Sequence, residues 1–295
     1  MQEYKTRKGI SIYALLAFVV LGNGILYFLT FFLNSYIEVS LIKIFMVVFS
    51  VYCLIYVLRV VSLVYIIRED GFEISSLWGF NKILIPFNEV NGYNIQIGKI
   101  NGLRLSGFGK TQYCFGRSVI ENVGITHMFV TSNKQVIYIH TENMSYGISP
   151  EKVEEFEDFL IRKGYEKGDF KIKINRNRDL FKKRSFFIPF IIVTLIILLI
   201  TLNPLILYLM NKLPSKMPLF FDATFKPIIF GTGKQFAFKQ MTYGVLNMII
   251  LICMHYAAYF CAKYDKRSAY KYIYISLITA ITFLLIQLRI LNLYL

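Results

Sequence analysis

The feature that most constrains this chain is a set of five long apolar windows with almost no charge. A bilayer core about 30 Å thick is crossed by roughly 20 apolar residues in a helix. The windows are Ile10–Leu33, Leu41–Ile67, Ser185–Met210, Gln240–Ala262 and Tyr272–Leu295. Charged residues make up 17% of the chain, against roughly 25% in soluble domains. The sequence therefore predicts an integral membrane protein with about five helical spans.

The net charge of +15 is unevenly distributed along the chain. Residues 68–170 hold 11 Lys and Arg and 13 Asp and Glu, so this long polar stretch is slightly acidic. The basic excess therefore flanks the apolar windows, where it signals topology and contacts anionic lipid. Because the polar stretch carries no basic stripe, nucleic acid is not an expected partner.

The Lys and Arg count in the short flanks predicts the orientation. With the N-terminus inside, 14 flanking Lys and Arg face the cytoplasm, against five lysines in the opposite loop at 211–239. Seven of the 14 belong to the stretch 171–184 and are expected at the membrane surface: Lys171, Lys173, Arg176, Arg178, Lys182, Lys183 and Arg184. We expect a multi-pass plasma-membrane protein with a cytoplasmic polar domain and an extracellular C-terminus.

These patterns predict four parts of the chain. Residues 1–67 form an N-terminal transmembrane hairpin, and residues 68–170 form a folded domain. A basic juxtamembrane linker follows at 171–184. Residues 185–295 form a three-span membrane domain with an extramembrane loop at 211–239.

The polar domain reads as short strands followed by one helix. Alternating segments bounded by turn residues predict six strands: Phe72–Trp78, Lys82–Pro86, Gly92–Ile97, Thr126–Thr131, Gln135–His140 and Met144–Ile148. The fourth and fifth are expected to pair as a hairpin. Ser149 suits a helix N-cap and Pro150 the first helical position. An apolar stripe follows at Val153, Phe156, Phe159 and Leu160. This order predicts a small antiparallel barrel or sandwich closed by a helix.

The stretch Gly71–Gly164 resembles a bacterial pleckstrin-homology (PH) domain of membrane proteins. The resemblance is carried by four motifs: Ile85-Pro-Phe-Asn-Glu-Val90, Gly107-Phe-Gly-Lys110, Phe115-Gly-Arg117 and Tyr146-Gly-Ile-Ser-Pro150. It implies an α+β PH-like domain inserted among the membrane helices. It also implies a bacterial protein, from a family without a single established ligand.

A second segment, Tyr208–Phe220, is similar to the extramembrane "LP…P…F" segment of the DUF1648 family. The chain reads Leu213-Pro-Ser-Lys-Met-Pro-Leu-Phe220, and Gly231-Thr-Gly-Lys234 follows before the next window. Leu219 and Phe221 flank Phe220, where that family commonly has a histidine beside the phenylalanine. The resemblance implies membership of the Sdp-type toxin-immunity group.

Candidate ligand-binding residues lie in the glycine-rich stretch Gly98–Arg117, which we expect to be a flexible loop. Its cations are Lys99, Arg104, Lys110 and Arg117, and beside backbone N–H groups they suit a lipid phosphate or an acidic peptide. The alternative is a solvated hairpin loop whose glycines serve turns.

The sequence carries no recognisable catalytic or metal-binding pattern. The four cysteines form no CxxC pair, and no HExxH or GxSxG motif is present, so neither an enzyme, a metal nor a cofactor is expected. His255 is the titratable group expected in mid-membrane, as a proton relay or, more commonly, as a neutral side chain bonded to a neighbouring helix.

Three functions are consistent with these features. The first is a non-enzymatic binding or scaffold protein with an envelope-stress or peptide-immunity role, whose partner is a peptide, a protein or a second copy. The second is a transporter or channel component, in which Pro189 and Pro204 break the third span. The third is an anionic-lipid sensor that uses Arg104, Lys110 and Arg117.

Overall fold

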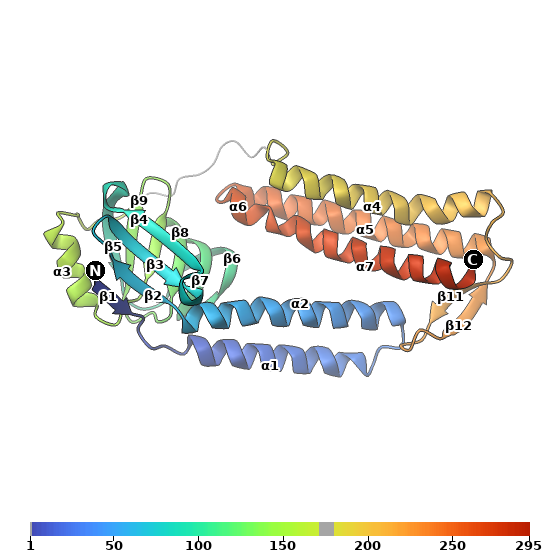
Figure 1. Ribbon diagram of the computed structural model, residues 1–295, viewed down its shortest axis with the longest axis horizontal. Helices are drawn as coiled ribbons and strands as arrows, with labels where there is room; N and C mark the ends of the chain where they lie inside the picture. The colour runs from blue at the N-terminus through green and yellow to red at the C-terminus, as the bar shows by residue number, and fades with distance from the viewer. Residues whose placement is uncertain (1, 171–179) are drawn as a thin grey trace. The chain divides into compact units, whose positions relative to one another are not determined.

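The computed structural model describes residues 2–170 and 180–295 (Figure 1). They divide into two compact units, one holding 2–23 and 48–170 and the other 24–47 and 180–295. Helices α1 (Ser11–Thr30) and α2 (Tyr36–Val61) contribute to both units. Within the described residues, five helical segments are long and apolar enough to cross a membrane. The prediction of about five such segments is confirmed.

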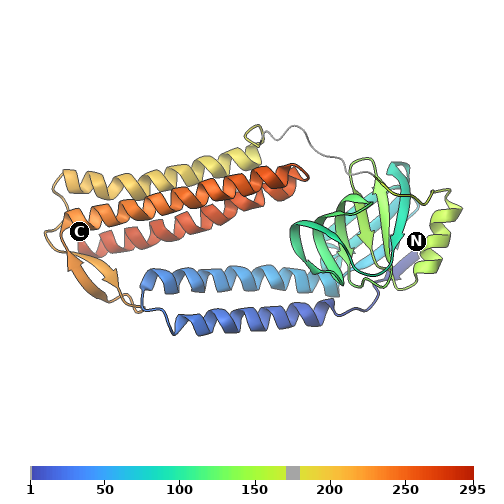
Figure 2. The ribbon, with the colours of Figure 1, turned by 180° about the vertical axis from the view of Figure 1, so that it is seen from behind.

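The second unit contains three long helices that run side by side (Figures 1 and 2). They are α4 (Arg184–Leu209), α5 (Gly233–Ala262) and α7 (Lys271–Tyr294), with the short α6 (Lys266–Ala269) before α7. A two-stranded sheet of β11 (Met217–Phe221) and β12 (Pro227–Gly231) links α4 to α5. A reciprocal capping box begins α5, because Thr232 Oγ1 accepts the Gln235 N–H and Gln235 Oε1 accepts the Thr232 N–H.

The interior of this helix bundle is mainly apolar, through residues such as Val193, Ile197 and Leu251, but it also holds a few buried polar side chains. Gln240, Asn247 and Gln287 are buried, and Gln287 Nε2 donates to the Ile200 carbonyl at 2.8 Å. Exposed leucines, isoleucines and phenylalanines cover the outer faces. An apolar outer surface of this kind suits a hydrocarbon solvent.

Two details of the windows differ from the sequence prediction. The second window was expected to be apolar helix as far as Ile67, but α2 ends at Val61 and Val64–Ile67 form strand β2. The segment is a strand because its side chains alternate between two faces, and Tyr65 and Ile67 on one face are buried in the core of the first unit. The helix also starts earlier than expected, so Glu38 lies in its first turn.

His255 was expected in mid-membrane, within the window Gln240–Ala262. It lies in the last third of α5, with its ring centroid 5.9 Å from that of Phe186 in the first turn of α4. Its Nδ1 is buried, and in the described part of the chain it has no hydrogen-bond partner.

The first unit holds two sheets that pack face to face, together with helix α3, and we call this the sandwich domain (Figure 2). The four-stranded sheet has the order β1-β2-β3-β4, formed by Gln2–Lys5, Val64–Ile67, Gly71–Ser76 and Asn81–Pro86. The six-stranded sheet has the order β5-β9-β10-β8-β7-β6. Its strands, in chain order from β5 to β10, are Val90–Gln96, Gly102–Lys110, Tyr113–Ile120, Gly124–Val130, Val136–Thr141 and Ser145–Ile148. The sequence prediction missed β1, β2, β6 and β7.

The predicted hairpin between the strands at Thr126–Thr131 and Gln135–His140 is wrong. Strand β10 lies between β8 and β9, parallel to β8 and antiparallel to β9. Gly147 makes this possible, because a Cβ there would lie 2.7 Å from Met128 Sδ. The central position of β10 therefore depends on Gly147, because the side chains of Met128 and Tyr138 on the neighbouring strands occupy the space that a Cβ would need.

The glycine-rich stretch predicted as a loop is largely a β-hairpin of β6 and β7. Gly107 lies opposite Gly116, and both have positive φ, at 102° and 107°. A Cβ on Gly116 would lie 2.4 Å from the Ser106 carbonyl oxygen. The glycines thus bend paired strands rather than freeing a loop.

Helix α3 (Val153–Arg162) closes the sandwich, but Ser149 does not cap it. Lys152 occupies the N-cap position, while Ser149 Oγ accepts the Thr131 N–H at 2.9 Å. Pro150 forms a β-bridge with Thr6, which keeps this segment extended. The predicted stripe on the helix is confirmed, since Val153, Phe156 and Leu160 are buried in the core and Phe159 packs against it.

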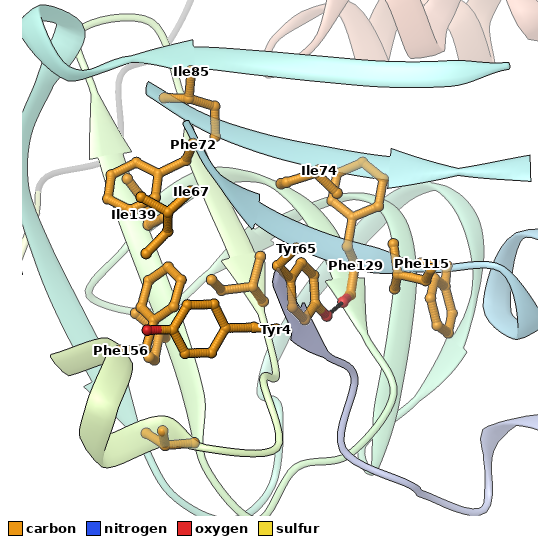
Figure 3. Close-up of a cluster of buried hydrophobic side chains, with 14 of the residues drawn as sticks. Tyr4, Tyr65, Ile67, Phe72, Ile74, Ile85, Phe115, Phe129, Ile139 and Phe156 are labelled. Atoms are coloured by element: carbon orange, nitrogen blue, oxygen red, sulfur yellow. Dashed lines mark hydrogen bonds between the residues drawn. The ribbon is translucent and has the colours of Figure 1, made fainter. Parts of the chain in front are cut away.

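The core lies between the sheets and under α3 (Figure 3). Phe156 contacts the rings of Tyr4 and Phe72, with centroids 5.3 and 5.5 Å away. Tyr65 is 2% exposed, and its hydroxyl donates to the Phe129 carbonyl at 2.6 Å and accepts the Ser149 N–H at 3.1 Å. Burial raises the pKa of Tyr65 above its usual value, so the hydroxyl stays protonated.

Tyr65→Phe is expected to lower the opening free energy of the sandwich domain by about 1–3 kcal/mol, because two buried backbone groups lose their partner. Hydrogen exchange of the full chain in detergent measures this free energy strand by strand. Protection of β8 and β10 equal to that of the unmutated chain would contradict the prediction.

Candidate functional site

The four cations predicted as a ligand site lie on the β6–β7 hairpin and the connection before it. Lys99, Arg104 and Lys110 are exposed, and Arg117 is half-buried on β7 beside His127 of β8. Arg104 lies near the thiol of Cys114, whose pKa is raised by burial and lowered in part by Arg104. The side chains are thus distributed along a bent hairpin.

The predicted surface cations of the linker are described only at its end. Lys171, Lys173, Arg176 and Arg178 lie outside the described residues. Lys183 is the N-cap of α4 and Arg184 its first residue, and both are exposed, as is Lys182.

A cavity of about 600 Å³ lies where the N-terminal segment meets the start of α1 and the end of α2. We call it the basic cavity. Its charged wall is formed by Lys5, Arg7 and Lys8 together with one acid, Glu3. Its apolar wall comes from the two helix ends and the start of β2, through Ile12, Val60, Val61, Leu63 and Val64.

Strand β1 fixes the backbone of the charged wall. It pairs antiparallel with β2, from Gln2 opposite Ile67 to Lys5 opposite Val64. Because Tyr4 points into the core, strand alternation directs the side chains of Glu3 and Lys5 away from it.

The other edge of the N-terminal segment is bonded to the chain just before α3. The Arg7 N–H donates to the Ser149 carbonyl at 2.9 Å, and the Glu151 N–H donates to the Lys5 carbonyl at 2.9 Å. Thr131 Oγ1 donates to the Arg7 carbonyl at 2.7 Å. The cations of the basic cavity therefore stand on an ordered backbone.

The chemistry of the basic cavity suits an amphiphilic anion. Three cations against one acid favour a negative group, and the adjacent start of α1 adds the positive end of a helix dipole. The apolar wall is continuous with Val61 at the end of α2, so a hydrocarbon chain attached to that group has a surface to lie on. Sequence analysis had treated Lys5, Arg7 and Lys8 only as topology signals.

The histidines of the sandwich domain occupy structural positions. His140 Nδ1 lies 2.8 Å from Ser145 Oγ, and its ring stacks on Phe170 with centroids 3.7 Å apart. Across residues 2–170 and 180–295, no group of three His, Cys, Asp or Glu side chains is arranged to hold a metal ion.

Two packed sheets closed by a C-terminal helix, in a chain with five helices apolar enough to cross a membrane, fit the class of PH-like domains. Comparison with known families agrees, since residues 63–164 match the family model described as the bacterial PH domain. The match begins at Leu63, so β2 belongs to this domain rather than to the preceding span.

The chain belongs to the same family as an uncharacterized protein of Clostridium acetobutylicum. The two are 39% identical over 291 residues, which cover 98% of each chain. The similarity thus includes the apolar helices as well as the PH domain. No solved structure matches the chain.

Proposed function

We propose that this protein is a non-enzymatic, membrane-anchored binding protein that recognises an anionic phospholipid headgroup in the basic cavity, at the edge of its PH domain. The observation that carries this proposal is the pairing of Lys5, Arg7 and Lys8 with an apolar wall at the ends of α1 and α2. If those helices cross a bilayer, their ends lie at headgroup depth. The positive-inside count supports a cytoplasmic PH domain, where anionic lipid is most abundant.

Replacing Lys5, Arg7 and Lys8 together by glutamine is expected to weaken binding of phosphatidylglycerol by roughly 100-fold. A cation near an anionic surface contributes about 1 kcal/mol, and each 1.4 kcal/mol is about tenfold in affinity. Native mass spectrometry of the full chain in detergent, titrated with phosphatidylglycerol or phosphatidylcholine, measures the change. Binding of phosphatidylcholine should be nearly unaffected, because its headgroup has no net charge.

The matched control replaces Lys99, Arg104 and Lys110 by glutamine, the same change in net charge on the β6–β7 hairpin. It should leave phosphatidylglycerol binding within about threefold of the unmutated chain, since exposed charges act weakly at a distance in salt. A larger loss from the hairpin variant than from the cavity variant would move the lipid site to the hairpin cations.

A second candidate function is peptide immunity, which the β11–β12 hairpin favours. Strand β11 begins inside the segment Tyr208–Phe220, which resembles DUF1648, and the hairpin exposes Phe220, Ile228, Ile229 and Phe230. Such an apolar surface beside apolar helices suits capture of a membrane-active peptide. Deleting the gene and challenging cells with such peptides tests the idea, and unchanged sensitivity would count against it.

A further inference from the structure

The connection between β3 and β4 exposes two large aromatic side chains close together. Residues 77–82 form this aromatic turn, in which Trp78 is 69% exposed and Phe80 is 94% exposed. Trp78 is the one tryptophan of the 295-residue sequence. Two aromatic rings left in water on one short turn point to a partner that covers them.

The backbone of the turn is held in a conformation that such residues rarely adopt. Leu77 and Trp78 have φ of 54° and 52°, and Gly79 follows at 92°. Left-handed backbone at bulky L residues is costly and persists where the surroundings impose it. Here β3 and β4 are paired up to Ser76 opposite Asn81, so the turn is tightly constrained.

The position of the turn is set by the end of α2. The Leu77 N–H donates to Ser62 Oγ at 2.6 Å, and Ser62 directly follows the last residue of that helix. Arg59 in the last turn of α2 lines a small cavity together with Ser76. The aromatic turn therefore lies beside the end of a candidate span.

A cation accompanies the aromatic rings. A Cβ on Gly79 would lie 3.2 Å from Lys82 Cε, so the end of the Lys82 side chain lies over Gly79, the residue between Trp78 and Phe80 in the sequence. Tryptophan with a neighbouring lysine is the combination enriched at the membrane–water interface, where the ring sits among headgroups and the ammonium meets phosphate.

We propose that Trp78 and Phe80 insert into the interfacial layer of the bilayer beside the end of α2 and anchor the PH domain to the membrane surface. The partner is the bilayer itself, because Ser62, which accepts the hydrogen bond from the turn, directly follows the candidate span Tyr36–Val61. The inference rests on the membrane insertion of α2 but not on the headgroup site, since the aromatic rings need no anionic lipid.

The single tryptophan makes the test direct. The full chain is reconstituted in neutral phosphatidylcholine vesicles, and Trp78 emission is measured with lipids brominated at shallow or deep positions of the acyl chain. We expect Trp78 to emit at a shorter wavelength than a tryptophan in water. Lipids brominated at shallow positions should quench this emission most strongly, and aqueous iodide should not quench it. Emission quenched by iodide and not by brominated lipid would overturn the proposal, because Trp78 would then lie in water. Protection from both quenchers would also overturn it, because Trp78 would then be covered by protein.

Three reporter variants in the Trp78→Phe background complete the design. Phe80→Trp should behave like the native chain, whereas Ile161→Trp, 56% exposed on α3 at the far end of the sandwich domain (Figure 1), should be quenched by iodide. Val51→Trp, 52% exposed in the middle of α2, should be quenched by deep bromines. If Val51→Trp is not quenched by lipid, membrane insertion of α2 fails. If it is quenched and Trp78 and Phe80→Trp are not, the anchor alone fails.

Discussion

Phe156→Ala is expected to destabilise the sandwich domain by about 3–5 kcal/mol, the range for truncating a fully buried phenylalanine. Phe156 is 1% exposed and packs edge-to-face on Tyr4 of β1. It also contacts Phe72 of β3, so its loss opens a cavity beneath α3 at the junction of helix and sheet. Because Tyr4 precedes the cations of the basic cavity, the loss should also loosen β1.

Hydrogen exchange of the full chain measures both effects, as reduced protection throughout the sandwich domain with the largest change at β1. The matched control is Ile161→Ala on the same helix, which is exposed and should change the opening free energy by less than about 0.5 kcal/mol. Equal effects of the two substitutions would show that α3 does not close the core as described.

Gly116→Ala is expected to cost roughly 3 kcal/mol or more and to unpair β6 from β7. Its φ of 107° lies in a region that L side chains rarely adopt. The added Cβ would lie 2.4 Å from the Ser106 carbonyl oxygen and 2.7 Å from Gly107 Cα, and paired backbone cannot move aside without breaking the ladder. The change should appear as lost exchange protection of both strands.

Gly98→Ala separates the two causes of this cost. Gly98 also has a positive φ, of 96°, but a Cβ there meets nothing within 4 Å. It should therefore cost only the backbone strain, about 1 kcal/mol. A cost for Gly98→Ala as large as that for Gly116→Ala would mean that steric contact across the hairpin is unimportant.

The same glycines show why part of the sheet was missed. A glycine-rich sequence with scattered cations is typical of a loop, and it lacks the alternation of apolar and polar residues that predicts a strand. In the structure Gly107 and Gly116 face each other across a bent ladder, so their lack of side chains is what allows the strands to approach. Local propensity cannot show this, because the residue that requires each glycine is its partner on the other strand.

The basic cavity and the aromatic turn were missed for a related reason. Lys5, Arg7 and Lys8 precede an apolar window and so resemble ordinary topology charges. Trp78 is the last residue of the predicted strand Phe72–Trp78, and Phe80 lies in the turn expected between that strand and the next. Their roles depend on β1 pairing with β2, some 60 residues later in the sequence, and on the bond between Leu77 and Ser62.

The amino-acid order alone was sufficient to predict the five apolar segments, most strands of the polar domain and the buried stripe of its closing helix. Hydropathy and the spacing of apolar residues are local properties of the sequence. They predict structure because exposing backbone groups to hydrocarbon, or apolar side chains to water, costs free energy at each residue. Strand order, the placement of β10 and the grouping of cations beside the helix ends arose only from long-range pairing. Such pairing depends on which distant segments fit together in three dimensions, a property that no single stretch of the chain carries.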